Sequence, residues 1–175
     1  MVKIVFILIE DLFEDPELIY PYYRMKEEGY KVFLVGPEKG MVYTGKKGVK
    51  MTSDISAEEA LGMKANALII PGGYSPDLMR RHRSMVELVE QASRNCLVIG
   101  AICHGPWMLI EADIIRGIKA TGFYSIAKDM INAGAEYIDN EVVVDKNIIT
   151  SRKPDDLPEF CKSIIEMIKA YFKDN

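Results

Sequence analysis

Cys103 lies in the segment Ala-Ile-Cys-His-Gly-Pro (residues 101–106), directly after an apolar run typical of a buried strand. Small residues stand two positions before it and two positions after it, as in the G-x-S-x-G turn that presents a nucleophile between a strand and a helix. Pro106 suits the first turn of that helix. A thiol held there would face free backbone N–H groups and the positive end of the helix dipole. We therefore expect its pKa to lie below the ordinary value of about 8.5.

The other two cysteines lack this setting. Cys96 stands just before a predicted strand and Cys161 lies on the apolar face of a predicted helix, so we interpret both as packing residues. Three cysteines without a C-x-x-C pair argue against a disulfide framework or a zinc site. The chain has only two histidines, His82 and His104, and we expect no metal and no cofactor.

His104 follows the cysteine directly, and two roles are open for it. Its imidazole could act as a general base, or its backbone N–H could donate to an oxyanion. A histidine base normally has an orienting acceptor, and no carboxylate is near His104 in the sequence. The acceptor must come from elsewhere in the fold or from another subunit. Gly73, in a Pro-Gly-Gly turn after a predicted strand, is a second candidate donor to the oxyanion.

Glu14 follows the first predicted strand and should lie at the same edge of the sheet as Cys103. A carboxyl close to a thiolate is pushed toward its protonated form, and it could then donate a hydrogen bond to the sulfur. The neighbouring acids Asp15 and Glu17 fit a simpler role, because negative charge is favourable in the first turn of a helix.

Apolar runs and helical spacing alternate along the chain, which is typical of a doubly wound α/β sandwich with a mostly parallel sheet. We predict one domain over residues 1–175, in which ligands bind beyond the carboxyl ends of the strands. Three segments follow such ends: residues 10–14, 71–77 and 103–104. The predicted strands span 2–9, 30–35, 65–70, 97–101, 141–145 and 148–151, the helices 15–29, 57–63, 84–94, 106–112, 127–133 and 155–172, and a hairpin 40–51.

The composition is that of an ordinary globular protein. The chain has 175 residues, 49% of them hydrophobic, and a net charge of -4. No basic stripe suggests a nucleic-acid partner, and no apolar run is long enough to span a bilayer or is followed by a signal cleavage site. We expect a cytoplasmic protein without membrane or nucleic-acid partners.

Taken together, these motifs resemble the PfpI-type intracellular proteases, within the superfamily of class I glutamine amidotransferase-like proteins. The likeness covers nearly the whole chain, and the Cys-His-Gly-Pro elbow combined with Phe-Glu-Asp is its specific part. The matching segments are residues 13–15, 17–21, 70–73, 101–106, 129–134, 141–145, 150–152 and 156–158.

The resemblance implies a flavodoxin-like three-layer sandwich with Cys103 as nucleophile and His104 beside it. It also implies that Glu14 contacts the sulfur and that the N–H groups of Gly73 and His104 form an oxyanion hole. In the family, the histidine pairs with a carboxylate from a neighbouring subunit, and the matching residue here is Asp77, where the family proteases have the longer Glu. Family members form dimers, trimers and hexamers, so the resemblance implies a homo-oligomer.

A family tyrosine near the pocket is replaced here by Phe123, with Tyr124 adjacent. Three functions are open. The leading hypothesis is an intracellular cysteine hydrolase acting on peptides. The alternative is a glyoxalase or protein deglycase acting on methylglyoxal-type aldehydes. The third is a redox-sensing or chaperone-like stress protein, in which an exposed low-pKa thiolate is oxidised to sulfinic acid.

Overall fold

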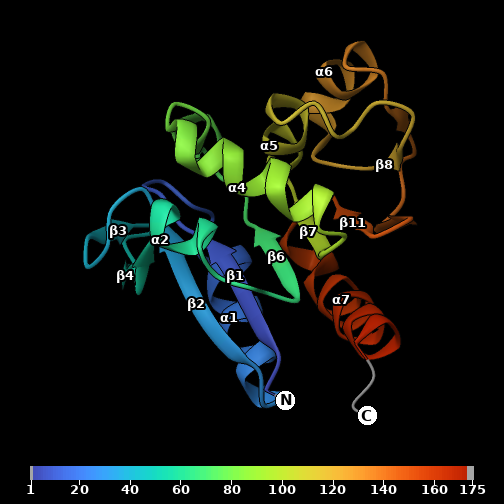
Figure 1. Cartoon of the computed structure of the whole chain (residues 1–175). Coiled ribbons are helices and arrows are strands. Elements are labelled where there is room, and N and C mark those ends of the chain that lie inside the picture. Colours follow the sequence, from blue (N-terminus) through green and yellow to red (C-terminus); the bar gives the residue numbers. More distant parts are fainter. Residues whose placement is uncertain (1, 173–175) are drawn as a thin grey trace.

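The computed structural model describes residues 2–172, and within them a seven-stranded sheet forms the centre of the fold (Figure 1). The strand order is β10-β11-β7-β6-β1-β2-β5, and only the edge pair of β10 with β11 is antiparallel. The strands are β1 (Ile4–Leu8), β2 (Lys31–Gly36), β5 (Ile55–Ser56), β6 (Ala67–Ile70), β7 (Val98–Ile102), β10 (Val142–Asp145) and β11 (Ile148–Ser151). The predicted α/β class with a mostly parallel sheet is confirmed.

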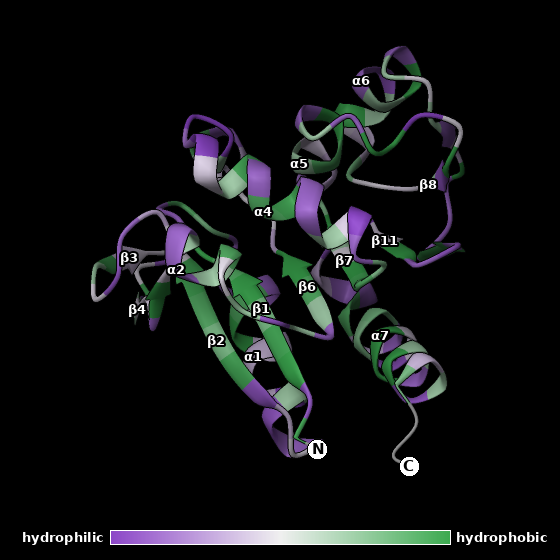
Figure 2. Cartoon of the chain, in the orientation of Figure 1, coloured by the Kyte–Doolittle hydropathy of each residue, from purple (hydrophilic) through white to green (hydrophobic). Residues whose placement is uncertain are grey.

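Helices cover both faces of this sheet, which gives three layers. On one face lie α1 (Asp15–Glu27) and α7 (Leu157–Tyr171), and on the other lie α2 (Ala57–Leu61), α4 (Arg83–Arg94) and α5 (Pro106–Glu111). Strand β1 shows why both faces must be covered. Val5 and Ile7 pack into the core beneath α1 and α7, whereas Phe6 and Leu8 pack into the opposite core. The apolar colouring of the central strands in Figure 2 reflects this double burial.

Smaller elements complete the chain. The predicted hairpin is present as β3 (Val42–Thr44) and β4 (Lys50–Thr52). The structure adds several short elements that the sequence patterns did not predict, because two to five residues carry too little periodicity. These are β5, α3 (Ser75–Met79), β8 (Lys119–Ala120), β9 (Glu136–Tyr137), η1 (Tyr124–Ile126) and η2 (Pro154–Asp156), while α6 (Ala127–Asn132) was expected. Between residues 2 and 172, no helix has the length and apolar character needed to cross a bilayer.

The order β7-β6-β1 brings three loops to one edge of the sheet. Because these parallel strands are neighbours, the segments after them meet, as predicted for residues 10–14, 71–77 and 103–104. A bridge between Phe13 and Gly73 ties the first two loops together. The N–H of Cys103 donates to the carbonyl of Ser151 at 3.0 Å, which fixes the third loop to β11.

Candidate active site

Cys103 occupies the turn between β7 and α5 with φ of 61°, in the left-handed region that residues with a side chain rarely adopt. This strained conformation confirms the predicted elbow. Gly105 allows strand and helix to approach, because a Cβ at that position would lie 2.6 Å from the carbonyl oxygen of Ile70 and 2.8 Å from that of Ile102. The thiol is buried, with only 7% of the residue exposed.

Two backbone N–H groups, those of Gly73 and His104, point to the sulfur. Gly73 has φ of 74°, and a Cβ there would lie 2.5 Å from the backbone nitrogen of Glu14. Only glycine therefore fits the place where the Pro-Gly-Gly turn meets the loop after β1. Both donors lie where the sequence predicted an oxyanion hole.

Glu17, not Glu14, is the carboxyl that contacts the nucleophile. Its side chain forms a hydrogen bond with the Cys103 thiol, and its Oε2 accepts the N–H of Gly72 at 2.8 Å. The residue is 0% exposed. The prediction that Glu14 contacts the sulfur is wrong because Glu14 precedes α1, whereas Glu17 lies in the first turn of the helix among its buried residues.

The spacing of residues in α1 contains the signal that sequence reasoning missed. Glu17 shares the buried stripe of the helix with Leu18, Pro21 and Met25, and an acid on an apolar stripe is unusual. Asp15 is also buried, and it accepts the N–H groups of the hairpin residues Lys47 and Val49. Both acids lie in the first turn of α1, as their predicted role at the helix N-terminus requires, but both also make buried contacts that the sequence did not predict.

Glu14 has a different partner at the mouth of the site. Its Oε2 lies 2.6 Å from the Nζ of Lys46, which comes from the turn of the β3–β4 hairpin. The same ammonium lies 5.3 Å from the ring centroid of Tyr74. The Lys46 ammonium therefore lies at the pocket with its positive charge balanced by the Glu14 carboxylate.

The ionisation of the buried pair differs from the sequence-based expectation. Burial raises the pKa of Glu17 to about 8, although the Gly72 N–H and the thiol hydrogen-bond to it. Burial and the adjacent Glu17 also raise the pKa of Cys103, and the N–H groups of Gly73 and His104 offset this only in part. The prediction of a lowered thiol pKa is therefore wrong, because it considered the helix N-terminus and not desolvation. At neutral pH, both groups hold their protons.

The His104 ring lies within hydrogen-bond distance of the thiol. Its Nδ1 lies 3.2 Å from the sulfur, and its Nε2 lies 3.3 Å from the Oγ of Ser125. The ring stacks on Phe123 at 5.2 Å and meets the edge of Trp107 at 5.1 Å. Burial and the charge of Lys46 lower the pKa of His104, so the imidazole is neutral and able to accept a proton.

Asp77 lies in α3 and is held by two cations of its own chain. Its carboxylate is 2.9 Å from Arg80 and 2.5 Å from Arg81, and these hydrogen bonds lower the pKa of Asp77. Arg80 also lies over the ring of Trp107, the neighbour of His104. The pairing of Asp77 with His104 of another subunit concerns an assembly and stays a prediction.

These residues line a cavity of about 530 Å³. Phe123 forms part of its wall, so the ring at this position carries no hydroxyl, and the adjacent Tyr124 is 77% exposed and does not line the cavity. A tyrosine does reach the lining from another loop, as Tyr74. The lining residues are Glu14, Glu17, Lys46, Gly73, Tyr74, Cys103, His104, Phe123, Ser125 and Pro154.

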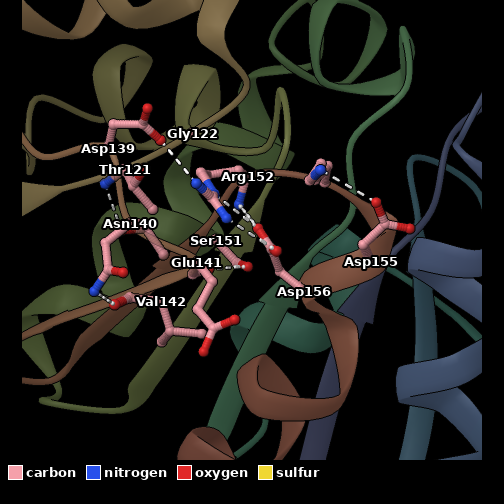
Figure 3. Close-up of polar contacts among 12 residues, drawn as sticks. Thr121, Gly122, Asp139, Asn140, Glu141, Val142, Ser151, Arg152, Asp155 and Asp156 are labelled. Carbon is pink, nitrogen blue, oxygen red and sulfur yellow. Dashed lines mark hydrogen bonds and ion pairs between the residues drawn. The ribbon is translucent and has the colours of Figure 1, made fainter.

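Arg152 supports the wall of this cavity from the end of β11 (Figure 3). Its Nη1 lies 2.9 Å from Asp139 and its Nε lies 3.0 Å from Asp156, which is 5% exposed. These bonds hold η2, and Pro154 at the start of η2 contacts the cavity. Arg152 therefore positions the wall, while Ser151 of the same segment accepts the backbone N–H of Cys103.

The three-layer fold, the strained elbow and the Cys103–His104 pair define an α/β enzyme with a cysteine nucleophile. A family model described as "DJ-1/PfpI family" matches residues 2–167, and the chain belongs to this family. The resemblance drawn from the motifs is thus confirmed.

Curated relatives cover almost the whole chain. "Deglycase PfpI" of Pyrococcus furiosus is 41% identical over 95% of this chain and 99% of its own. "Protein/nucleic acid deglycase 2" of Escherichia coli is 41% identical over 97% of this chain and 100% of its own. "Putative cysteine protease YraA" of Bacillus subtilis is 43% identical over 97% of this chain and 100% of its own.

Proposed function

We propose that this protein is a Cys103-dependent deglycase that acts on methylglyoxal-type aldehydes and on the adducts they form. The observation that carries the proposal is the contact between the Cys103 thiol and the buried Glu17 carboxyl, whose pKa is about 8. Converting a glyoxal to a hydroxy acid requires a proton to move between adjacent carbons. A carboxyl beside the sulfur supplies that step, whereas acyl transfer to water does not need it.

The geometry supports a sequence of steps. The thiol proton passes to Nδ1 of His104 as the sulfur electron pair forms a bond to the aldehyde carbon. The carbonyl oxygen gains negative charge and is stabilised by the N–H groups of Gly73 and His104. His104 passes its proton to the neighbouring carbonyl oxygen. Glu17 acts in its ionised form, a minor population at neutral pH given its pKa of about 8: it takes the proton from the carbon bonded to sulfur and delivers it to the neighbouring carbon, which leaves a thioester. Water hydrolyses the thioester and restores the thiol.

Two of the three relatives reported above carry deglycase names, which favours this function over the peptidase hypothesis that the motifs alone placed first. A peptidase remains the second candidate, since YraA is named as a protease and the neutral His104 beside the thiol also suits acyl transfer. Three free cysteines fit a reducing compartment such as the cytoplasm. We further propose a small aldehyde or peptide substrate and a homo-oligomer in which Asp77 approaches a neighbouring site.

The test compares the intact protein with Cys103→Ala, and with Cys96→Ala as a control at an exposed cysteine outside the cavity. Each is given methylglyoxal and a panel of fluorogenic peptides. We expect lactate formation that Cys103→Ala abolishes and Cys96→Ala retains. Peptide cleavage without lactate would replace the deglycase by the peptidase. No turnover of either substrate, together with selective oxidation of Cys103, would favour the redox-sensing hypothesis.

A further inference from the structure

Within a single chain, both ring nitrogens of the His104 imidazole already face a partner. One ring nitrogen faces the sulfur and the other faces the Oγ of Ser125 at 3.3 Å, while Phe123 and Trp107 pack against the ring. Asp77, the expected orienting carboxylate, is paired with arginines in this chain. We propose that Ser125 is a positioning residue that accepts the Nε2–H of His104 and so directs the Nδ1 lone pair at the Cys103 thiol.

This inference rests on the proposed function, in which the thiol must lose its proton. A neutral imidazole carries one N–H and one lone pair. If the hydrogen is on Nε2 and points to Ser125, then Nδ1 is free to accept the thiol proton. When the S–C bond forms and the S–H bond breaks, the proton moves to Nδ1, and the hydroxyl oxygen of Ser125 still accepts from the imidazolium.

The position of Ser125 is built into the fold. The N–H of Phe123 donates to the carbonyl of Cys103 at 2.8 Å, so the turn that follows is held in register with the nucleophile. Ser125 lies in η1, and the next residue, Ile126, is 1% exposed and anchors that turn in the core. The hydroxyl is thus held toward the ring although the serine itself is exposed.

The other charged groups acting on His104 are few. Lys46 approaches from the hairpin and lowers the imidazole pKa, and Asp129 on α6 has the opposite effect. Asp129 is engaged by the indole N–H of Trp107 at 2.9 Å. Neither Lys46 nor Asp129 contacts Nε2 of His104, which faces Ser125. Substitution of Ser125 should therefore change which ring nitrogen of His104 carries the hydrogen, and it removes no charged group.

The test uses the full chain as Ser125→Ala, Ser125→Thr and the control Ser163→Ala, which lies on α7 outside the cavity. The first readout is the rate of iodoacetamide alkylation at Cys103 between pH 6 and 9. The second is the nitrogen chemical shifts of His104, for which His82 serves as internal reference because the chain has two histidines.

We expect Ser125→Ala to slow alkylation near pH 7 about three- to tenfold, as befits one hydrogen bond, and to reduce the Nε2–H tautomer of His104. Ser125→Thr should keep the alkylation rate and the His104 tautomer of the parent protein. Ser163→Ala should change neither readout. An unchanged alkylation profile and an unchanged tautomer in Ser125→Ala would overturn the proposal. If these readouts change as expected but no aldehyde is turned over, the positioning role stands and the proposed function fails.

Discussion

The carboxyl of Glu17 contacts the thiol of Cys103, and the contact acts unequally on the two buried acids: it raises the pKa of the thiol, whereas the thiol slightly offsets the rise that burial causes in the pKa of Glu17. The sulfur alone also faces the N–H groups of Gly73 and His104. Even with these two donors the thiol ionises less readily than the carboxyl, so a sulfur nucleophile at neutral pH requires a base beside it, the role that we propose for His104.

Glu17→Gln should reduce turnover of methylglyoxal by about a hundredfold or more, because an amide cannot carry a proton between carbons. Gln can still accept the Gly72 N–H, so the fold should be preserved. The matched variant is Glu14→Gln, which removes only the ion pair with Lys46 and should change turnover less than about fivefold. Steady-state kinetics of both variants check this, and the reverse order of effects would restore Glu14 as the carboxyl of the mechanism.

The raised pKa of Glu17 also predicts how stability depends on pH. The unfolded chain releases this proton near pH 4.5, the ordinary pKa of a glutamate, whereas the folded chain holds it until about pH 8. Between these values the unfolded state binds fewer protons, so the free energy of unfolding falls as pH rises, by up to about 1.4 kcal/mol per pH unit from this group.

Glu17→Gln removes that titration. Its stability relative to the parent should therefore increase from pH 5 to pH 8 and level off above that range. Urea unfolding of both proteins at several pH values measures the difference. A difference that does not vary with pH would show that Glu17 ionises at its ordinary pKa.

The backbone at Cys103 predicts a stability difference between two inactive variants. Ala at a φ of 61° keeps the strain, whereas Gly relieves it at no steric cost. Cys103→Gly should therefore be more stable than Cys103→Ala by about 0.5–1 kcal/mol. Ala101→Gly, in the extended strand β7, provides the control and should be destabilising. If glycine destabilises at both positions, the turn at Cys103 is not strained.

Arg152→Met should lower the free energy of unfolding by more than the control substitution, since it leaves the carboxylate of Asp156 buried without its cation. The control is Arg116→Met, because Arg116 and its partner Asp113 are both exposed and their pair should contribute under about 0.5 kcal/mol. Thermal or urea unfolding compares the two. If both substitutions changed the free energy of unfolding equally, the Arg152 network in Figure 3 would contribute no more than the exposed Arg116–Asp113 pair.

The sequence by itself determined the alternation of strands and helices and the location of the nucleophile. Runs such as residues 2–9 are apolar on both faces, which in a strand requires helices on both sides. The small residues around Cys103 likewise define a strand-to-helix turn without reference to distant residues. Both signals are local, so they can be recognised in a single segment.

Only the tertiary structure decided which acid meets the thiol and whether that thiol is charged. Glu14 and Glu17 differ by less than one helical turn, and the orientation of α1 against the sheet selects Glu17. The thiol pKa depends on burial and on the adjacent Glu17, which together outweigh the N–H groups of Gly73 and His104. Likewise, Ser125 contacts His104 because a backbone hydrogen bond from the N–H of Phe123 to the carbonyl of Cys103 holds the turn that carries Ser125. These contacts join residues that are remote in the chain, and the strength of their electrostatic interactions depends on how completely the fold excludes water.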